Sequence, residues 1–261
     1  MQQTTDKATH SFPHQQSHYS CSTMVKALLA VSSYHGPFYP NGDHTGVFAS
    51  EAIEPFLELA QKGFEITIAS ETGEYEYDPH SLTEEALLGK VKEVYENKDS
   101  AFNTALKNIK KASDVVDEKF HLFFASAGHA TLYDYPKAKN LQKILINTYL
   151  NGGVVAAVCH GPAIFNNLEN PETKQPFIKG KKITGFTDKG EEELGLTDVI
   201  KKEHLLTIED IAKKEGATYV APKGPWDSFS VVDGKIVTGV NPQSAFATVR
   251  DAIVALESVN N

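Results

Sequence analysis

The hydrophobic pattern changes period several times along the chain, and these changes predict alternating strands and helices. Four short apolar runs predict buried strands: 25–31, 64–69, 121–125 and 153–158. Apolar residues at helical spacing predict helices at 45–62, with Thr45 as N-cap and Gly63 as its stop, and at 137–150. Strand–helix–strand units of this kind predict parallel strands joined by right-handed crossovers.

The last third of the chain continues the alternation with shorter elements. It predicts helices at 161–168, 190–193 and 208–215, a strand at 184–187, a hairpin at 229–238 and a terminal helix from Asn241-Pro242 to about Leu256. Asp233-Gly234 is a strong signal for the turn of that hairpin. Together these elements predict an α/β fold with a mixed, mainly parallel sheet sandwiched between helices.

The domain organisation follows from where this pattern is absent or weak. Residues 1–23 are rich in Gln, Ser, Thr and His and hold no apolar stretch, which predicts a disordered polar tail without a secretory signal. Residues 24–261 are expected to form a single domain. Within it, residues 70–118 have an intermittent helical pattern at 82–95 and 101–109, and we expect them to be an insertion over the edge of the sheet.

Composition narrows the classes of partner. The 261 residues carry a formal net charge of −9, so electrostatics disfavour binding to nucleic acid or to anionic lipid surfaces. No apolar run reaches the roughly 18 residues of a membrane span. Two cysteines, Cys21 and Cys159, cannot build a disulfide framework, and this predicts a reducing, cytoplasmic location.

Cys159 lies at a position with strong chemical implications. It follows the apolar run Val154–Val158 and precedes His160-Gly161-Pro162, a pattern that resembles a nucleophile elbow between a strand and a helix. A helix starting there would favour the thiolate and lower the thiol pKa from about 8.5. The alternative is a cysteine that only packs in the core.

The wider sequence resembles the ThiJ/PfpI superfamily. Within it, the chain is similar to the fungal glutathione-independent glyoxalases, also described as heat-shock chaperones of the thirty-one-kilodalton class. The resemblance extends from Met24 onward and rests on these strings: Ala156–Phe165, Thr45–Phe48, Ser70–Gly73, Phe123–His129, Asp134–Lys139, Gly185–Asp188, Gly224–Asp227 and Thr238–Ser244. It implies a flavodoxin-like fold of the kind found in class I glutamine amidotransferases.

The resemblance also implies roles for particular residues. Cys159, His160 and Glu191 match the family's catalytic triad, and Glu51 matches a glutamate that hydrogen-bonds the thiol and should have a raised pKa. Gly128, with the amide of His160, matches an oxyanion hole. As further pocket-lining residues we consider His129 and Trp226.

The implied reaction is that of a lyase, the conversion of methylglyoxal and water to D-lactate. Cys159 would take the place of glutathione, so no cofactor is expected. The sequence contains no phosphate loop, zinc motif or dinucleotide fingerprint, and no spacing demands a metal. The implied partners are small reactive dicarbonyls and a second copy in a homodimer, in the cytoplasm or also in the nucleus.

Three other functions are compatible with the same residues. A holding chaperone would need an exposed apolar patch and no cysteine chemistry. A cysteine peptidase, amidase or deglycase would use the same three groups for acyl transfer. Redox sensing through oxidation of Cys159 would depend on the same thiol.

Overall fold

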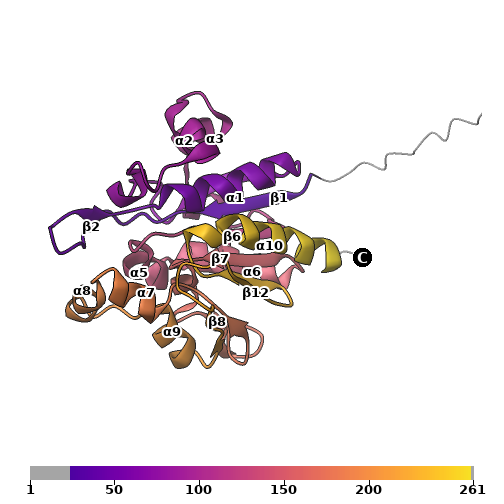
Figure 1. The fold of residues 1–261 in the computed structure, drawn as a ribbon. Coiled ribbons are helices and arrows are strands. Elements are labelled where there is room, and N and C mark those ends of the chain that lie inside the picture. Colours follow the sequence, from indigo (N-terminus) through magenta and orange to yellow (C-terminus); the bar gives the residue numbers. More distant parts are fainter. Residues whose placement is uncertain (1–23, 260–261) are drawn as a thin grey trace, which may run out of the picture.

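A seven-stranded sheet forms the middle layer of the structure, a computed structural model that describes residues 24–259 (Figure 1). In spatial order its strands are β12 (Ser230–Asp233), β13 (Ile236–Gly239), β7 (Val154–Val158), β6 (Leu122–Ala125), β1 (Lys26–Ala30), β4 (Glu65–Ser70) and β5 (Lys110–Lys111). Only β12 runs antiparallel to its neighbour, in the hairpin with β13. The predicted mixed, mainly parallel sheet is therefore confirmed.

The central strands are apolar throughout because both faces of the sheet are covered. In β1, Ala27 and Leu29 point into one core, whereas Leu28 and Ala30 point into the other, and all four are fully buried. β1 and β4 pair residue by residue, from Lys26 opposite Glu65 to Ala30 opposite Ala69. Side chains of the two strands that lie opposite each other therefore point to the same face of the sheet.

Helices cover both faces of this sheet (Figure 1). One face packs against α1 (Ala49–Gln61) and α10 (Ala245–Val259), with α2 (Gly89–Glu96) and α3 (Ala101–Lys107) against α1. The other face packs against α4 (Ala112–Val115), α6 (Lys139–Leu150), α9 (Ile208–Lys214) and the 3-10 helix η3 (Gly161–Phe165).

Short elements complete the described part of the chain. The remaining helices are α5 (Thr131–Asp134), α7 (Asp188–Glu193), α8 (Thr197–Lys202), η1 (Pro79–Leu82), η2 (Tyr135–Lys137) and η4 (Pro242–Ser244). Three small two-stranded sheets pair β2 (Gly36–Pro37) with β3 (His44–Thr45), β8 (Glu169–Asn170) with β9 (Gln175–Pro176), and β10 (Lys182–Ile183) with β11 (Thr218–Tyr219).

Three predicted elements differ from the structure. Thr45 is not the N-cap of α1, which begins at Ala49; its hydroxyl instead donates to Asp78 (2.9 Å) and accepts from the Ala130 amide (3.1 Å). The predicted helix 161–168 is only the 3-10 helix η3, which ends at Phe165. The strand predicted at 184–187 is wrong in place, because β10 ends at Ile183.

The segment 70–118 contains η1, α2, α3, β5 and α4. Its last part adds β5 beside β4 as the edge strand of the sheet, and α2 packs on α1. Its interpretation as an insertion in a single domain stays a prediction, and the predicted polar tail at 1–23 lies outside the described residues.

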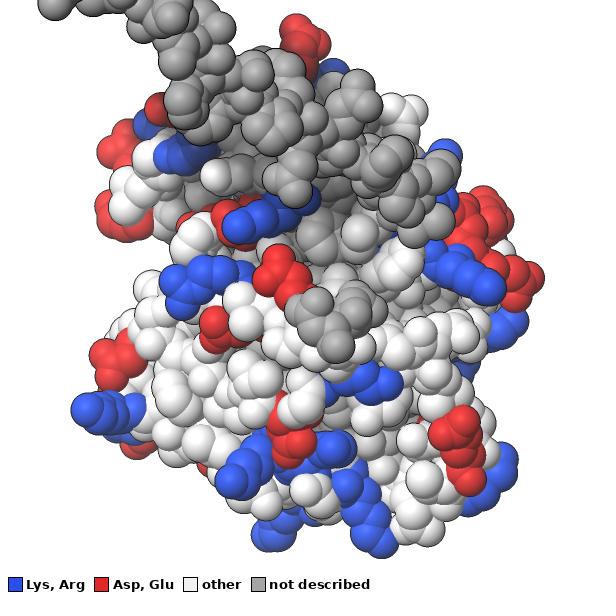
Figure 2. All heavy atoms as spheres, turned by 90° about the vertical axis from the view of Figure 1, so that its right-hand side faces the viewer, with Lys and Arg blue, Asp and Glu red and all other residues white. Residues whose placement is uncertain are grey.

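The surface charge is mixed. Acidic and basic side chains are interspersed on the face shown in Figure 2, with a group of basic side chains near its lower edge. Among residues 24–259, no helix combines the length and the apolar character that crossing a membrane requires.

Candidate active site

The nucleophile elbow forms where β7 ends. Cys159 has φ of +56°, a left-handed conformation that a non-glycine residue rarely adopts and that is typical of such elbows. Its amide donates to Gly239 O (2.9 Å) and its carbonyl accepts from the Phe186 amide (2.8 Å), so neighbouring segments hold both sides of the turn. Gly161 is required here, since a Cβ at that position would lie 2.6 Å from Ala125 O.

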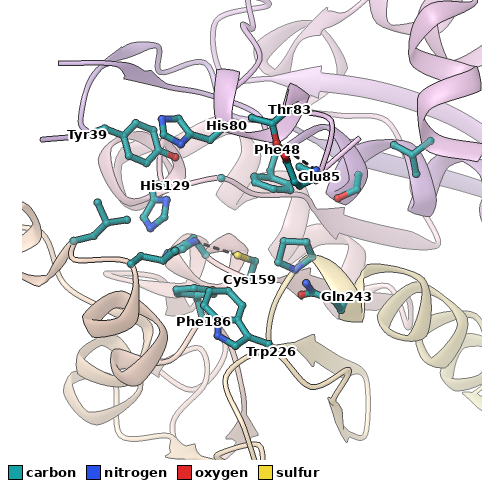
Figure 3. A pocket seen from close by; sticks show the side chains of 18 of the residues that line it. Tyr39, Phe48, His80, Thr83, Glu85, His129, Cys159, Phe186, Trp226 and Gln243 are labelled. Atoms are coloured by element: carbon teal, nitrogen blue, oxygen red, sulfur yellow. Dashed lines mark hydrogen bonds between the residues drawn. The ribbon is translucent and has the colours of Figure 1, made fainter. Parts of the chain in front are cut away.

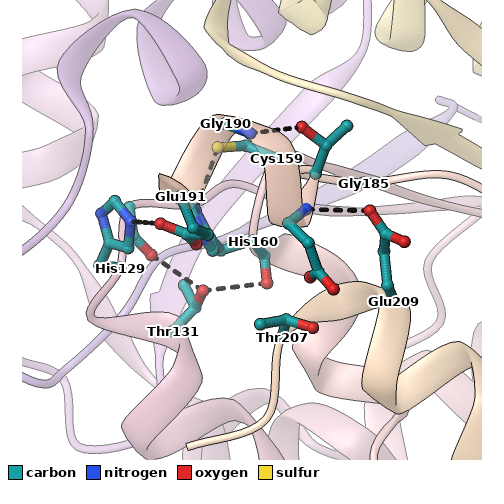
Figure 4. Close-up of polar contacts among 12 residues, drawn as sticks. His129, Thr131, Cys159, His160, Gly185, Gly190, Glu191, Thr207 and Glu209 are labelled. Atoms are coloured by element: carbon teal, nitrogen blue, oxygen red, sulfur yellow. Dashed lines mark hydrogen bonds and ion pairs between the residues drawn. The ribbon is translucent and has the colours of Figure 1, made fainter. Parts of the chain in front are cut away.

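The thiol, an imidazole and a carboxylate form a continuous chain of contacts (Figure 4). Sγ of Cys159 lies 3.2 Å from Nδ1 of His160, and Nε2 of His160 lies 2.7 Å from Oε1 of Glu191. The three residues are at most 4% exposed. The order thiol, imidazole, carboxylate is the one that a nucleophile, its base and an orienting acid need.

Glu191 reaches this position because of the way α7 begins. Thr187 is the N-cap, and its hydroxyl accepts from the Gly190 amide (2.8 Å). Glu191 then lies in the first turn, where the helix dipole favours a carboxylate. Its neighbours Glu192 and Glu193 are exposed, so Glu191 alone of the three turns inward.

His129 contacts the second oxygen of the same carboxylate. It lies in the loop after β6, and its Nε2 is 3.0 Å from Oε2 of Glu191. Its ring centroid is 4.0 Å from that of His160 and 4.7 Å from that of Phe38, on which it stacks. His129 and His160 follow the adjacent parallel strands β6 and β7, whose carboxyl ends lie at the same edge of the sheet.

The charges of these groups follow from burial and hydrogen bonding. Burial lowers the pKa of His160 to about 4, with a further decrease from His129 and an opposing effect from Glu191. Burial alone would raise the pKa of Glu191, but the two histidines hold it well below its usual range. At neutral pH the set therefore contains an ionised carboxylate and a neutral His160.

Glu51 is a second buried carboxyl at the thiol. It lies in α1 and is fully buried, and neither of its oxygens makes a hydrogen bond of normal geometry within the described residues. Burial raises its pKa to about 8, while interaction with the Cys159 thiol partly opposes the shift. The expected raised pKa is confirmed in direction, and the carboxyl is protonated at neutral pH.

The expected low pKa of the thiol is wrong. Burial raises the pKa of Cys159 well above its ordinary value, and the carboxyls of Glu51 and Glu191 raise it further. Only the His160 amide, which donates to the sulfur, opposes this shift. The physical reason is that η3 has five residues and so a weak dipole, whereas burial of the sulfur is nearly complete.

The thiol opens into a pocket of about 870 Å³ (Figure 3). Gly128, His129, Cys159, His160 and Trp226 all line it. Glu191 and Glu51 do not line the pocket, but Glu191 contacts His160 and Glu51 lies at the thiol, so the structure brings all the predicted residues together. The indole of Trp226 donates to Glu193 of α7 (2.7 Å) and forms an exposed part of the wall.

Gly128 has a backbone that demands glycine. Its φ is +133°, and a Cβ there would overlap Gly46 O. The Gly128 carbonyl accepts hydrogen bonds from both the amide and the hydroxyl of Thr131. The expected oxyanion hole of the Gly128 and His160 amides stays a prediction.

Several pocket residues were not predicted from the sequence. Phe186 packs against the imidazole of His160 with ring centroids 4.7 Å apart. Tyr39 lines the pocket, and its hydroxyl donates to the buried Asp78 (2.7 Å). Neither belongs to a spacing motif; only the string Gly185–Asp188, noted for its resemblance, contained Phe186.

The described residues also include one group that could hold a metal ion. His129, His160 and Glu191 offer ligand atoms that all lie within 4.8 Å of one another. The sequence did not indicate this group, because its members are about 30 residues apart in the chain and follow no ligand spacing. Two imidazoles and a carboxylate suit Zn²⁺ or Fe²⁺ in donor type.

Fold and site together define an α/β protein with a cysteine nucleophile elbow backed by histidine and glutamate. The sequence profile of the DJ-1/PfpI family matches residues 44–255, and the chain belongs to that family. It is 59% identical to glyoxalase 3 of Candida albicans over 234 residues, which cover 90% of this chain and 99% of the relative.

Comparison with a second relative and with a solved structure gives the same family and fold. The chain is 52% identical to the glutathione-independent glyoxalase HSP31 of Saccharomyces cerevisiae over 233 residues, 89% of this chain and 98% of the relative. The crystal structure of glyoxalase III from Candida albicans superposes with a TM-score of 0.87 at 59% identity, covering 89% of this chain and 97% of that one. The predicted family and fold are thus confirmed.

Proposed function

We propose that the chain is a glutathione-independent glyoxalase that converts methylglyoxal and water to D-lactate. The observation that carries the proposal is the 3.2 Å contact of the Cys159 thiol with His160, backed at 2.7 Å by Glu191, in a pocket open to a small molecule. The similarity to glyoxalase 3 of Candida albicans and to the glutathione-independent glyoxalase HSP31 of Saccharomyces cerevisiae supports the same activity.

The first half of the reaction uses Cys159 as the internal thiol. His160 Nδ1 accepts the thiol proton as Sγ bonds to the aldehyde carbon, and the imidazolium then protonates the carbonyl oxygen to give a hemithioacetal. His160, with the protonated Glu51, moves the hydrogen of the first carbon to the second carbon through an enediol. The first carbon is oxidised and the second reduced, so no external redox partner takes part.

The second half releases the product. The isomerised intermediate is a thioester between Cys159 and lactate, and water adds to its carbonyl carbon as the C–S bond breaks. A thiol with a high pKa needs a base at the moment of attack, and His160 Nδ1 lies at the required distance. We assign the reaction to the lyases on this basis, with Cys159, His160 and Glu191 as its triad and Gly128 at its oxyanion site.

The substrate range, the oligomeric state and the cellular location belong to the same proposal. We propose a small dicarbonyl substrate such as methylglyoxal or glyoxal, a homodimer by likeness to the family, and a cytoplasmic or also nuclear location. The low cysteine content, two in 261 residues, is the observation behind the reducing compartment.

A replacement of the nucleophile tests the activity. Purified protein is mixed with methylglyoxal in the absence of glutathione, and D-lactate is measured by a stereospecific coupled assay. We expect wild-type turnover and a loss of at least about 10³-fold for Cys159→Ser. Cys21→Ser, the matched change at the chain's other cysteine, should retain activity. Lactate formation by a folded Cys159→Ser variant, or none by the wild type, would refute the proposal.

A holding-chaperone role is a second candidate, and the rim of the pocket favours it. Leu88, Leu194 and Trp226 line the pocket although they are 61%, 48% and 41% exposed. Exposed apolar side chains around an opening can hold unfolded segments. Suppression of client aggregation that survives Cys159→Ser but decreases in a Leu88→Ser, Leu194→Ser double variant would support this role.

A further inference from the structure

The carboxylate of Glu191 is shared between two histidines rather than held by one. Oε1 lies 2.7 Å from Nε2 of His160, and Oε2 lies 3.0 Å from Nε2 of His129 (Figure 4). All three side chains are buried, and they come from the loop after β6, the elbow after β7 and helix α7. The usual triad uses only one of these two contacts.

This sharing fixes the tautomers of both rings. An ionised carboxylate only accepts hydrogen bonds, so the nitrogen facing it must carry the proton in each histidine. In its neutral form, each ring therefore carries its proton on Nε2 and leaves Nδ1 unprotonated. In His160 this free nitrogen faces the sulfur at 3.2 Å. In His129 it makes no hydrogen bond to any described residue, and the ring lines the pocket.

The reaction in the proposed function needs a base at two different places. The thiol and the first carbon lose protons close to the sulfur, where His160 lies. The water that attacks the thioester must approach from the pocket and lose its proton there. Both histidines line the pocket, but His160 is only 1% exposed whereas His129 is 7% exposed, so His129 is the more accessible to water.

A single carboxylate also limits the pair to one stabilised imidazolium at a time. The rings are 4.0 Å apart, so a charge on one disfavours a charge on the other. The two histidines are therefore suited to act in turn. Phe38, stacked on the outer face of His129, leaves the ring little freedom to rotate away from Glu191.

We propose that His129 is a catalytic base for hydrolysis of the thioester, and that His160 serves the formation of that thioester. The proposal rests on the proposed glyoxalase function. His129 Nδ1 takes a proton from water as the oxygen bonds to the thioester carbon, and the C–Sγ bond then breaks. The sulfur regains a proton from the new carboxylic acid through His160, and His129 releases its proton to solvent, which leaves thiol and lactate.

Two substitutions of His129 separate a base from a merely positioning residue. In His129→Gln the side-chain amide still donates to Glu191 but has no basic nitrogen. In His129→Phe the stacking on Phe38 is kept but the hydrogen bond is lost. His35→Gln is the matched control, because His35 is exposed and contacts only the ring of His44 among the aromatic groups.

The half-reactions are measured separately by single turnover. Enzyme is mixed with a slight deficit of methylglyoxal, free substrate is removed by rapid gel filtration, and hydroxylamine is added. Hydroxylamine cleaves thioesters without a base and yields lactohydroxamate, which mass spectrometry quantifies, whereas spontaneous hydrolysis yields lactate.

We expect both His129 variants to form the thioester and to hydrolyse it about 10²-fold more slowly than the wild type. Their trapped thioester should appear as lactohydroxamate, and His35→Gln should behave as wild type. His160→Gln should give neither product. Thermal unfolding and the rate of thiol alkylation check that each variant is folded.

Three results would overturn the assignment. Hydrolysis within about threefold of wild type in both variants would mean that His129 has no part in it. Hydrolysis lost in His129→Phe but restored in His129→Gln would make it a positioning residue. Loss of thioester formation in a folded His129→Gln variant would place His129 in the first half. A wild type that forms neither lactate nor hydroxamate would instead refute the glyoxalase function itself.

Discussion

Helices α1 and α7 each bring one buried glutamate to the site, and the two carboxyls are in opposite states. Glu51 of α1 is 0% exposed and Glu191 of α7 is 2% exposed, so desolvation acts on both. Yet the pKa of Glu51 is raised to about 8, while that of Glu191 is held far below its usual range. Burial alone therefore does not decide whether such a carboxyl is ionised.

Hydrogen-bond donors account for the difference. Glu191 receives two N–H groups, one on each oxygen, and stays ionised. Glu51 receives none of normal geometry and faces a thiol that is itself protonated. The α7 region thus holds a negative charge that accepts from two imidazoles, and the α1 region holds a protonated carboxyl, which in the proposed reaction would supply a proton. Such a separation of pKa values is how one site assigns acid and base roles.

The largest expected effect comes from removing the charge in α7. In Glu191→Gln the amide must donate to one ring, which forces that histidine into the opposite tautomer. We expect kcat for lactate formation to decrease by about 10³- to 10⁴-fold, as for tautomer errors in other triads. The control is Glu192→Gln, the exposed neighbour with the same change in charge. A loss below about tenfold would show that the fixed charge is not needed.

Removing the proton in α1 should have a smaller effect. Glu51→Gln keeps the size and neutrality of the protonated carboxyl but cannot exchange a proton. We expect kcat to decrease by about 10²-fold, the contribution of one general acid or base. Glu58→Gln, in the same helix and also buried, is the control and should keep kcat. Equal kcat for Glu51→Gln and wild type would mean that Glu51 relays no proton.

Much of this molecule follows from local pattern. The central strands were predictable because both of their faces are buried, which produces apolar runs such as 154–158. The elbow was predictable because only a sharp turn fits between that run and Gly161-Pro162. Glu191 was assigned by resemblance, since nothing in its own charge run separates it from Glu192 and Glu193.

What failed depended on tertiary structure. The predicted decrease of the Cys159 pKa was wrong, because the sulfur is buried by segments such as α1 that are far away in the sequence. Thr45 fits the pattern of an N-cap, but its hydroxyl is used by Asp78, 33 residues later. The contact of His129 with Glu191 spans 62 residues and has no local signal at all.

The comparison of the two glutamates also predicts how stability depends on pH. A folded-state pKa of about 8 for Glu51, against about 4.3 in an unfolded chain, means that the folded protein binds the extra proton between these values. Stability therefore decreases as pH rises through this window. Below about pH 6.5 the effect is masked, because His160, with its pKa lowered to about 4, makes stability increase with pH there.

Between pH 6.5 and 8 the contribution of Glu51 is not opposed by His160, since both states of that histidine are then mostly neutral. Asp134, whose pKa is raised to about 6, has also completed most of its titration. At about 1.4 kcal/mol per pH unit, wild type should lose about 2 kcal/mol of unfolding free energy relative to Glu51→Gln over this interval. Urea unfolding of both proteins at the two pH values measures the difference. Equal slopes would mean that Glu51 is already ionised in the folded protein, and the contrast between α1 and α7 would disappear.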